Sequence, residues 1–419
     1  MSFEVFKTLV DRICLDKKKT SDEFKRFSFI FHGGEPTIIG YENLNKFCHY
    51  AFCKFTEAGL DFKFGIQTNA TLLDDKFLAL FAKYNIDVGL SFDGGAKESN
   101  KGRTNKDQSF FLGILDKCRQ YGLQFGILSV VSPQNINYTK ENIAFLQKKA
   151  GLNAAKINFA EDVTHNGQFE VSPQEFFEKS FLVILNQYNK LLKNKKIFED
   201  DNINQLIDKY IKQLFDDNLN TFNSNYYGNC NCSFCGAGSR VLEISPDGTV
   251  NYCGRYSKDD EVSQCGDIKN LDFLAVHTRR KYYQRIYLKH KLLLDTKCDT
   301  CVAAGICDYG CLAFYYSQNK TFGIKTSFIC EYYKAIIDYF SKHTPEIFKL
   351  YYLMKRKSDN TLYIRSSQVV TRDRCHHLET KINSPNLRNQ KNRFFVIPDP
   401  DWKGSSGQCH QFKIVQGKK

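Results

Sequence analysis

Two hydrophobic periodicities alternate along the first 165 residues of the chain. Short apolar runs rich in β-branched and aromatic residues recur about every 30 residues, and each pair is separated by a segment whose apolar positions follow the helical repeat. This alternation predicts an α/β fold of repeated βα units on a parallel sheet. The predicted strands are residues 27–34, 61–69, 87–94, 123–131 and 154–162.

Helical patterns also flank the predicted sheet. Phe3, Phe6 and Val10 fall on one face of an N-terminal helix, Ser172–Glu175 is typical of a capping box, and an amphipathic helix runs from about Ile203 to Phe215. The composition then becomes rich in cysteine, and the pattern weakens after about residue 345. We predict a partial barrel at 1–165, a helical bridge at 166–227, a cysteine-rich α+β domain at 228–345 and a C-terminal extension of unknown role at 346–419.

Charge and apolar content indicate which kinds of protein, partner and cellular location to expect. The net charge is +13, and 42% of the residues are hydrophobic, which excludes a disordered chain. The basic stretch 277–291 suits a solvated helix face or a dock for an acidic leader peptide, and a nucleic-acid partner is not expected. The sequence has no apolar run near 18 residues and no signal peptide, so we expect a cytoplasmic protein without a membrane partner.

The cysteines follow a regular spacing. Cys235, Gly248 and Cys253 form C-x12-G-x4-C, and residues 298–311 form C-x2-C-x5-C-x3-C, followed by Cys330. In a reducing compartment, thiols in fours indicate a metal rather than disulfides, either zinc or iron–sulfur clusters. A zinc ribbon pairs two C-x2-C knuckles, and residues 298–311 hold one, so the pattern favours two [4Fe–4S] clusters.

This spacing resembles the SPASM domain of radical S-adenosylmethionine (SAM) enzymes in all seven cysteines. The resemblance implies two auxiliary [4Fe–4S] clusters with interleaved ligands. One would bind Cys235, Cys253, Cys311 and an upstream cysteine, for which Cys230 competes with Cys232. The other would bind Cys298, Cys301, Cys307 and Cys330, while Cys265 is expected to be an ordinary residue of a β-turn.

Polar and glycine residues follow three of the predicted strands, where parallel α/β folds place their ligands. The segment "GGEP" resembles the SAM-binding motif of the same family, in which the carboxylate holds the methionine ammonium group. "QTN" and "LSFDG" with a nearby arginine resemble its second and third contact segments, although strand-end capping also explains such residues. The residues concerned are Gly33, Gly34, Glu35, Pro36, Gln67, Thr68, Asn69, Ser91, Asp93 and Arg103.

The family's C-x3-C-x2-C segment, which binds the SAM-cleaving cluster, does not occur in the sequence, and five of the six barrel strands are predicted. Either Met1 is an internal methionine of a longer protein that carries a third cluster upstream, or the chain is a degenerate relative that makes no radical. Cys14 and Cys118 are solitary, and Cys48 and Cys53 lie on an amphipathic helix, where a core role is expected.

With a complete set of clusters, the resemblance implies that a 5′-deoxyadenosyl radical takes a hydrogen atom from a peptide or protein substrate, with flavodoxin or ferredoxin as electron donor. Sulfatase-maturating members place an acid directly after the matching cysteine, whereas Gly254 and Arg255 follow Cys253 here. We therefore favour maturation of a ribosomally made peptide. The alternatives are sulfatase maturation, a non-catalytic SPASM module that relays electrons, and a zinc-stabilised interaction protein.

Overall fold

A computed structural model describes most of the chain up to residue 355, and a small sheet beyond it. The described residues are 1–19, 26–101, 103–104, 106–152, 154–160, 171–188, 199–215, 241–255, 263–270, 301–307, 311, 313, 328–355, 362–363, 394–398 and 411–416. The chain divides into two compact units, each made of separate stretches of sequence. The first is Met1–Ser172, Asn231–Cys298 and Gly310–Ser327, and the second is Pro173–Cys230, Asp299–Tyr309 and Phe328–Lys419.

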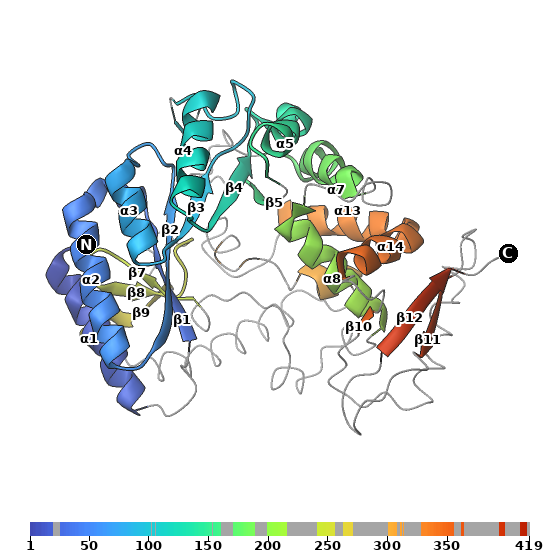
Figure 1. Cartoon of the computed structure of the whole chain (residues 1–419). Coiled ribbons are helices and arrows are strands. Elements are labelled where there is room, and N and C mark those ends of the chain that lie inside the picture. Colours follow the sequence, from blue (N-terminus) through green and yellow to red (C-terminus); the bar gives the residue numbers. More distant parts are fainter. Residues whose placement is uncertain are drawn as a thin grey trace. The chain divides into compact units, whose positions relative to one another are not determined.

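A parallel sheet with helices in its crossovers forms the larger part of the first unit (Figure 1). The five strands of this sheet that belong to the first unit lie in chain order, each parallel to the next, and so confirm the predicted α/β fold with a partial barrel. The strands are β1 (Arg26–Phe31), β2 (Asp61–Thr68), β3 (Asp87–Ser91), β4 (Phe125–Val131) and β5 (Ala154–Phe159). The helices are α1 (Phe3–Lys19), α2 (Tyr41–Glu57), α3 (Asp75–Lys83), α4 (Gln108–Gln120) and α5 (Thr139–Lys148), with short 3-10 turns at Pro36–Ile39 and Ile136–Tyr138.

The two faces of this sheet differ in character. One face carries buried apolar side chains, such as Phe64, Ile66 and Leu90, which form a core with aromatic residues of α1 and α2. Because side chains alternate along a strand, the residues between them point to the other face. That face holds small and polar residues near its centre, among them Gly65, Gln67, Gly89, Ser91 and Gly126.

A second, antiparallel sheet in the first unit is built from the cysteine-rich region. It contains β7 (Glu243–Ile244), β8 (Thr249–Asn251) and β9 (Gln264–Asp267) in that order. Its buried residues Val250 and Ile268 pack with Leu9 of α1, beside β1 (Figure 1). The turn between β7 and β8 has Gly248 at φ 99°, a left-handed conformation that favours glycine.

Helices and aromatic side chains make up most of the described second unit. Phe181, Tyr332 and Phe340 meet in its core. The helix predicted to start at the capping box begins at Pro173 but contains a π-helical turn at Phe177–Phe181, which the sequence analysis did not predict. The elements are α6 (Pro173–Phe176), α7 (Leu182–Tyr188), β6 (Glu199–Asp200), α8 (Asp201–Phe215), α11 (Ala304–Cys307), α13 (Phe328–Lys342) and α14 (Thr344–Lys355), followed by β10 (Leu362–Tyr363), β11 (Phe394–Pro398) and β12 (Gln411–Gln416).

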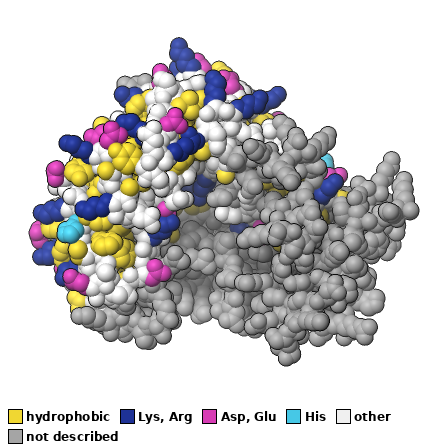
Figure 2. Space-filling model, in the orientation of Figure 1, with side chains coloured by type: hydrophobic (Ala, Val, Ile, Leu, Met, Phe, Trp, Pro, Cys, Tyr) yellow, Lys and Arg dark blue, Asp and Glu magenta, His cyan; other side chains and the backbone are white. Residues whose placement is uncertain are grey.

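The visible surface of the described residues mixes charge types. Figure 2 shows Lys and Arg side chains scattered among acidic and apolar ones, and the basic stretch 277–291 lies outside the described residues. None of the described helices has the length and apolar composition needed to cross a membrane. The predicted four-part division of the chain stays a prediction.

Candidate functional site

The loop after β1 and the loop after β2 are joined through one carboxylate. Gly33 has φ 122°, which suits glycine, and it lets the chain turn towards Glu35 directly after the strand. Oε1 of Glu35 accepts hydrogen bonds from the backbone N–H and hydroxyl of Thr37 and from the hydroxyl of Thr68, at 2.7 Å in the last case. Oε2 accepts one from the N–H of Asn69 at 2.8 Å. The "GGEP" and "QTN" segments therefore meet at the carboxyl edge of the sheet.

The loop after β2 is held in one conformation by its own side chains. The Asn69 carbonyl oxygen Oδ1 accepts hydrogen bonds from the N–H and the hydroxyl of Thr71. The buried Ala70 adopts a left-handed φ of 65°, which is costly for a residue with a side chain, and its N–H donates to the Thr68 hydroxyl. Strain of this kind persists where the surroundings fix the backbone, as these hydrogen bonds do.

Gln67 and Ser91 meet on the face of the sheet that carries the small and polar residues. The Gln67 amide nitrogen donates a 2.7 Å hydrogen bond to the Ser91 hydroxyl across β2 and β3. The side chain can lie there because Gly89 is its register neighbour, and a Cβ atom at that position would stand 2.2 Å from Gln67 Oε1. The structure therefore brings two predicted ligand contacts together and adds a glycine that the sequence analysis did not single out.

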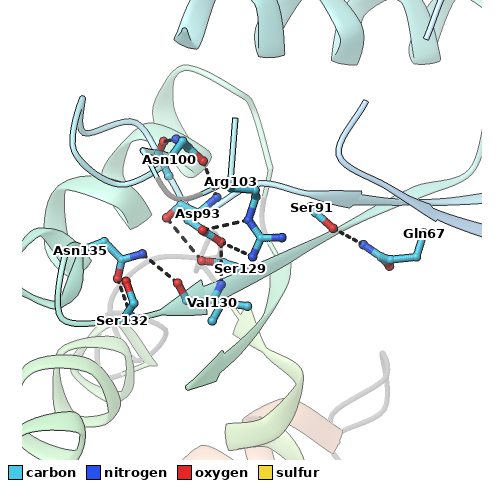
Figure 3. A network of polar contacts seen from close by, with 10 residues as sticks. Gln67, Ser91, Asp93, Asn100, Arg103, Ser129, Val130, Ser132 and Asn135 are labelled. Atoms are coloured by element: carbon cyan, nitrogen blue, oxygen red, sulfur yellow. Dashed lines mark hydrogen bonds and ion pairs between the residues drawn. The ribbon is translucent and has the colours of Figure 1, made fainter. Parts of the chain in front are cut away.

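Asp93 and Arg103 form a two-pronged ion pair (Figure 3). The Arg103 Nε atom lies 2.9 Å from Oδ2 of Asp93 and its Nη2 atom 2.9 Å from Oδ1, which also accepts from the N–H of Val130. Burial raises the pKa of Asp93 above its ordinary value, and the Arg103 guanidinium opposes that rise. The Asp93 side chain is 9% exposed and that of Arg103 22%, so the guanidinium is the more accessible partner.

Two asparagines that the sequence analysis missed anchor the loop after β3. Asn100 accepts from the N–H of Asp93 and donates to the carbonyl of Gly94, while Asn142 of α5 accepts from the N–H of Ala96 and the hydroxyl of Ser99. These contacts join residues up to 46 positions apart in the chain, so no local motif marks them. The signal that was available is "DGG", since close packing favours glycine.

Four of the described cysteines that belong to the predicted cluster sets form two pairs. In the first unit, the backbone N–H of Arg255 donates to Cys253 Sγ at 3.4 Å, and its Nη1 atom lies 4.0 Å from Cys311 Sγ. In the second unit, the Glu331 carboxylate raises the pKa of Lys334, and the nearby thiols of Cys301 and Cys330 add to that rise. Each pair belongs to one of the two ligand sets that the resemblance implies.

The remaining predicted ligands leave the two sets incomplete in the described residues. Cys307 is the last residue of α11 in the second unit. Within the described part of the chain, no three side chains of His, Cys, Asp or Glu come together as a metal site. Cys230, Cys232, Cys235 and Cys298 lie outside that part.

Three other thiols are shielded from ionisation. Burial raises the pKa of Cys48 to about 12 and those of Cys118 and Cys265 to about 11. The predicted core role of Cys48 is confirmed, whereas Cys53 on the same helix is only partly buried and faces His49. Cys265 lies in strand β9 rather than in a turn, so the predicted placement of this residue was wrong, and its thiol contacts the carbonyl of Val250.

Comparison with known proteins relates this geometry to a class of enzymes. No protein-family profile matches the chain. The solved structure of native anSMEcpe with bound AdoMet superposes with a TM-score of 0.66 at 19% identity over 85% of this chain and 91% of that one, and the form with AdoMet and the Cp18Cys peptide gives 0.64. Streptococcus suis SuiB bound to the precursor peptide SuiA gives 0.53 at 16% identity, over 77% and 69%.

The fold is therefore that of radical SAM enzymes with a SPASM domain, as the cysteine spacing indicated. Among proteins of similar sequence, a cysteine-type anaerobic sulfatase-maturating enzyme from Clostridium novyi is 25% identical over 349 residues, which cover 81% of this chain and 85% of that enzyme. The chain is thus similar in sequence to a cysteine-type anaerobic sulfatase-maturating enzyme.

Proposed function

We propose that the chain binds SAM at the carboxyl edge of its parallel sheet and takes part in the radical maturation of a peptide or protein. The observation that carries this proposal is the carboxylate of Glu35. Its Oε1 atom is occupied by three hydrogen bonds, whereas Oε2 accepts one, from Asn69. A carboxylate oxygen has two lone pairs, so Oε2 keeps acceptor capacity for the ammonium group of a ligand.

Neighbouring residues supply the other features that a SAM site needs. Gly33 and Gly34 have open space where a Cβ atom would lie, so a ligand can approach their backbone. The paired Gln67 and Ser91 present an amide and a hydroxyl, and Arg103 presents a partly exposed guanidinium. When bound at a SAM-cleaving cluster, SAM supplies hydrogen-atom abstraction; the protein binds it, orients it and excludes water.

The residues present fit some of the implied cofactors better than others. Carboxylate, amide and glycine positions fit SAM, and the two pairs of neighbouring thiols fit auxiliary iron–sulfur clusters completed by Cys230 or Cys232, Cys235, Cys298 and Cys307. The sequence has no C-x3-C-x2-C segment, so its residues do not fit a SAM-cleaving cluster. A flavodoxin or ferredoxin remains the proposed electron donor of the auxiliary clusters.

The substrate class is inferred from the structural neighbours and from the residues that follow Cys253. The structural neighbours hold peptides, which supports a peptide or protein as substrate here. Gly254 and Arg255 follow Cys253, where a sulfatase-maturating enzyme is expected to carry an acid, so we favour a ribosomally made peptide. Sulfatase maturation is the second candidate because of the sequence similarity to a cysteine-type maturating enzyme. Equilibrium binding of a sulfatase-derived cysteine peptide to the reconstituted chain tests the second candidate: specific binding supports sulfatase maturation, and no binding speaks against it.

The variant Glu35→Gln tests the SAM site directly. Removing the charge from a hydrogen-bonded carboxylate costs about 1.5–3 kcal/mol, so SAM should bind about 10- to 150-fold more weakly in equilibrium dialysis. Glu57→Gln is the matched control, because Glu57 is an exposed carboxylate on α2 paired with Lys54. If Glu35→Gln and Glu57→Gln bind SAM equally well, Glu35 is not a ligand-binding residue and the proposal loses its support.

A further inference from the structure

One arginine contacts both described thiols of the first cysteine pair. Arg255 reaches Cys253 through its backbone N–H, at 3.4 Å, and Cys311 through its side chain, at 4.0 Å. These cysteines are far apart in sequence but lie in the same unit. Arg255 is an exposed residue, so its guanidinium lies at the surface beside the thiols.

Positive charge and N–H donors beside the sulfur ligands raise the reduction potential of an iron–sulfur cluster. Each one-electron reduction makes an iron–sulfur cluster more negative, so a nearby cation stabilises the reduced form more than the oxidised form. Hydrogen bonds to the ligand sulfurs act in the same direction. A guanidinium stays protonated at every relevant pH, which makes its effect on the potential independent of pH.

The local backbone gives Arg255 its position. Asn251 and Ser245 hold the Glu243 carboxylate within the β7–β8 hairpin, and Gly254 passes beside that side chain, since a Cβ atom at Gly254 would lie 3.2 Å from Glu243 Cγ. A residue with a side chain at position 254 would crowd Glu243. Gly254 therefore fits beside Glu243, and the N–H of Arg255 directly after it donates to the sulfur of Cys253.

We propose that Arg255 is a positioning residue that raises the reduction potential of the auxiliary cluster held by Cys253 and Cys311. This inference rests on the proposed function, because it requires that these thiols bind a cluster. The cluster of the first unit is thereby set at a higher potential than a neutral residue at position 255 would give it.

The experiment is a redox titration of the anaerobically reconstituted full chain, followed by electron paramagnetic resonance. Replacing Arg255 by glutamine should shift the ratio of reduced to oxidised cluster about tenfold at a fixed applied potential, which is a fall of 59 mV for a one-electron couple. Only one of the two cluster signals should move. Because the guanidinium is exposed, the shift should shrink at high salt. Arg255→Lys, which keeps the charge but loses the planar fork, should retain most of the wild-type potential.

Lys269→Gln is the matched control. Lys269 follows β9 in the same small sheet, is exposed, and its side chain has no polar partner among the residues that the structure describes. It should leave both potentials unchanged. Equal potentials in the wild type and Arg255→Gln overturn the proposal, as does loss of the cluster in both Arg255 variants, which would mean that Arg255 is needed for assembly. A wild-type chain that takes up no iron refutes the proposed clusters themselves, which is a different failure.

Discussion

The substitution Gly89→Ala should weaken ligand binding while leaving the stability of the fold nearly unchanged. A methyl group at Gly89 would stand 2.2 Å from Oε1 and 2.9 Å from Cδ of Gln67. These atoms are the far end of a flexible side chain, so the amide will swing away and the backbone will stay in place. The substitution therefore breaks the 2.7 Å hydrogen bond from Gln67 to Ser91 without disturbing β2 or β3.

Two opposing terms keep the stability of this variant close to that of the wild type. The lost hydrogen bond costs about 0.5–1.5 kcal/mol of unfolding free energy. Alanine in a strand regains about 0.5–1 kcal/mol relative to glycine, because the unfolded chain has less freedom to lose. Ligand binding has no such offset. If the Gln67–Ser91 pair contacts SAM, loss of one positioned polar contact worth about 1 kcal/mol weakens binding about fivefold.

Gly126→Ala provides the control, because Gly126 is the register partner of Gly89 on β4 and lies on the same face. A Cβ atom there has nothing within 4 Å, so the variant adds a methyl group but moves no side chain. Equilibrium dialysis with SAM should give fivefold weaker binding for Gly89→Ala and unchanged binding for Gly126→Ala. Equal affinities in all three proteins refute the reasoning. An equal loss in both variants also refutes it, because the methyl group itself would then be blocking the ligand.

Three further predictions concern the packing of the first unit. Gly95→Ala should lower the free energy of unfolding by about 1–3 kcal/mol in thermal or urea denaturation, because its Cβ would lie 2.3 Å from a buried phenylalanine of α5. The control Gly113→Ala, on the exposed face of α4, should instead raise the free energy of unfolding by up to about 1 kcal/mol. Similar effects of the two substitutions would contradict the packing. Burial raises the pKa of Cys48 to about 12 and of Cys118 to about 11, so both should resist alkylation of the folded chain at pH 8 while Cys53 reacts, and mass spectrometry of the labelled peptides decides. These thiols have a pKa near 9.0 in the unfolded chain and a higher pKa in the folded chain. Their contribution to stability is therefore complete below pH 9.0 and is lost as the pH rises towards the folded pKa values; denaturation at pH 8 and 10 measures this fall, which Cys48→Ala should reduce.

The sheet was predictable because its signal is local and repeated. Each strand is a short apolar run, each helix has one apolar face, and the alternation of the two leaves few arrangements besides a parallel sheet. Strand ends were less predictable. The first strand was expected to reach residue 34 and ends at Phe31, because Gly33 turns the chain and Glu35 caps the short turn that follows. Apolar content alone does not mark that turn.

The candidate site was predictable only where its residues form short motifs. "GGEP" and "QTN" stand next to strand ends, so their meeting at one edge follows from parallel topology. The contacts that hold the site are of another kind. Asn142 reaches Ser99 from a different helix, and Gly89 makes room for a side chain on the neighbouring strand. Such pairs depend on the register of the sheet and the docking of helices, which one sequence does not specify.

The ion pair after β3 changes the roles that we expect for Asp93 and Arg103 in ligand binding. Asp93 was expected to touch SAM, but both its oxygens already bind Arg103, and one also accepts from the N–H of Val130. Its side chain is 9% exposed against 22% for Arg103, so a ligand reaches the guanidinium first. We therefore expect Asp93 to act by aiming Arg103 and fixing the end of β4. A carboxylate that holds a guanidinium in both prongs of its fork restricts its rotation, and a ligand that binds the remaining N–H donors then meets an arginine that is already ordered.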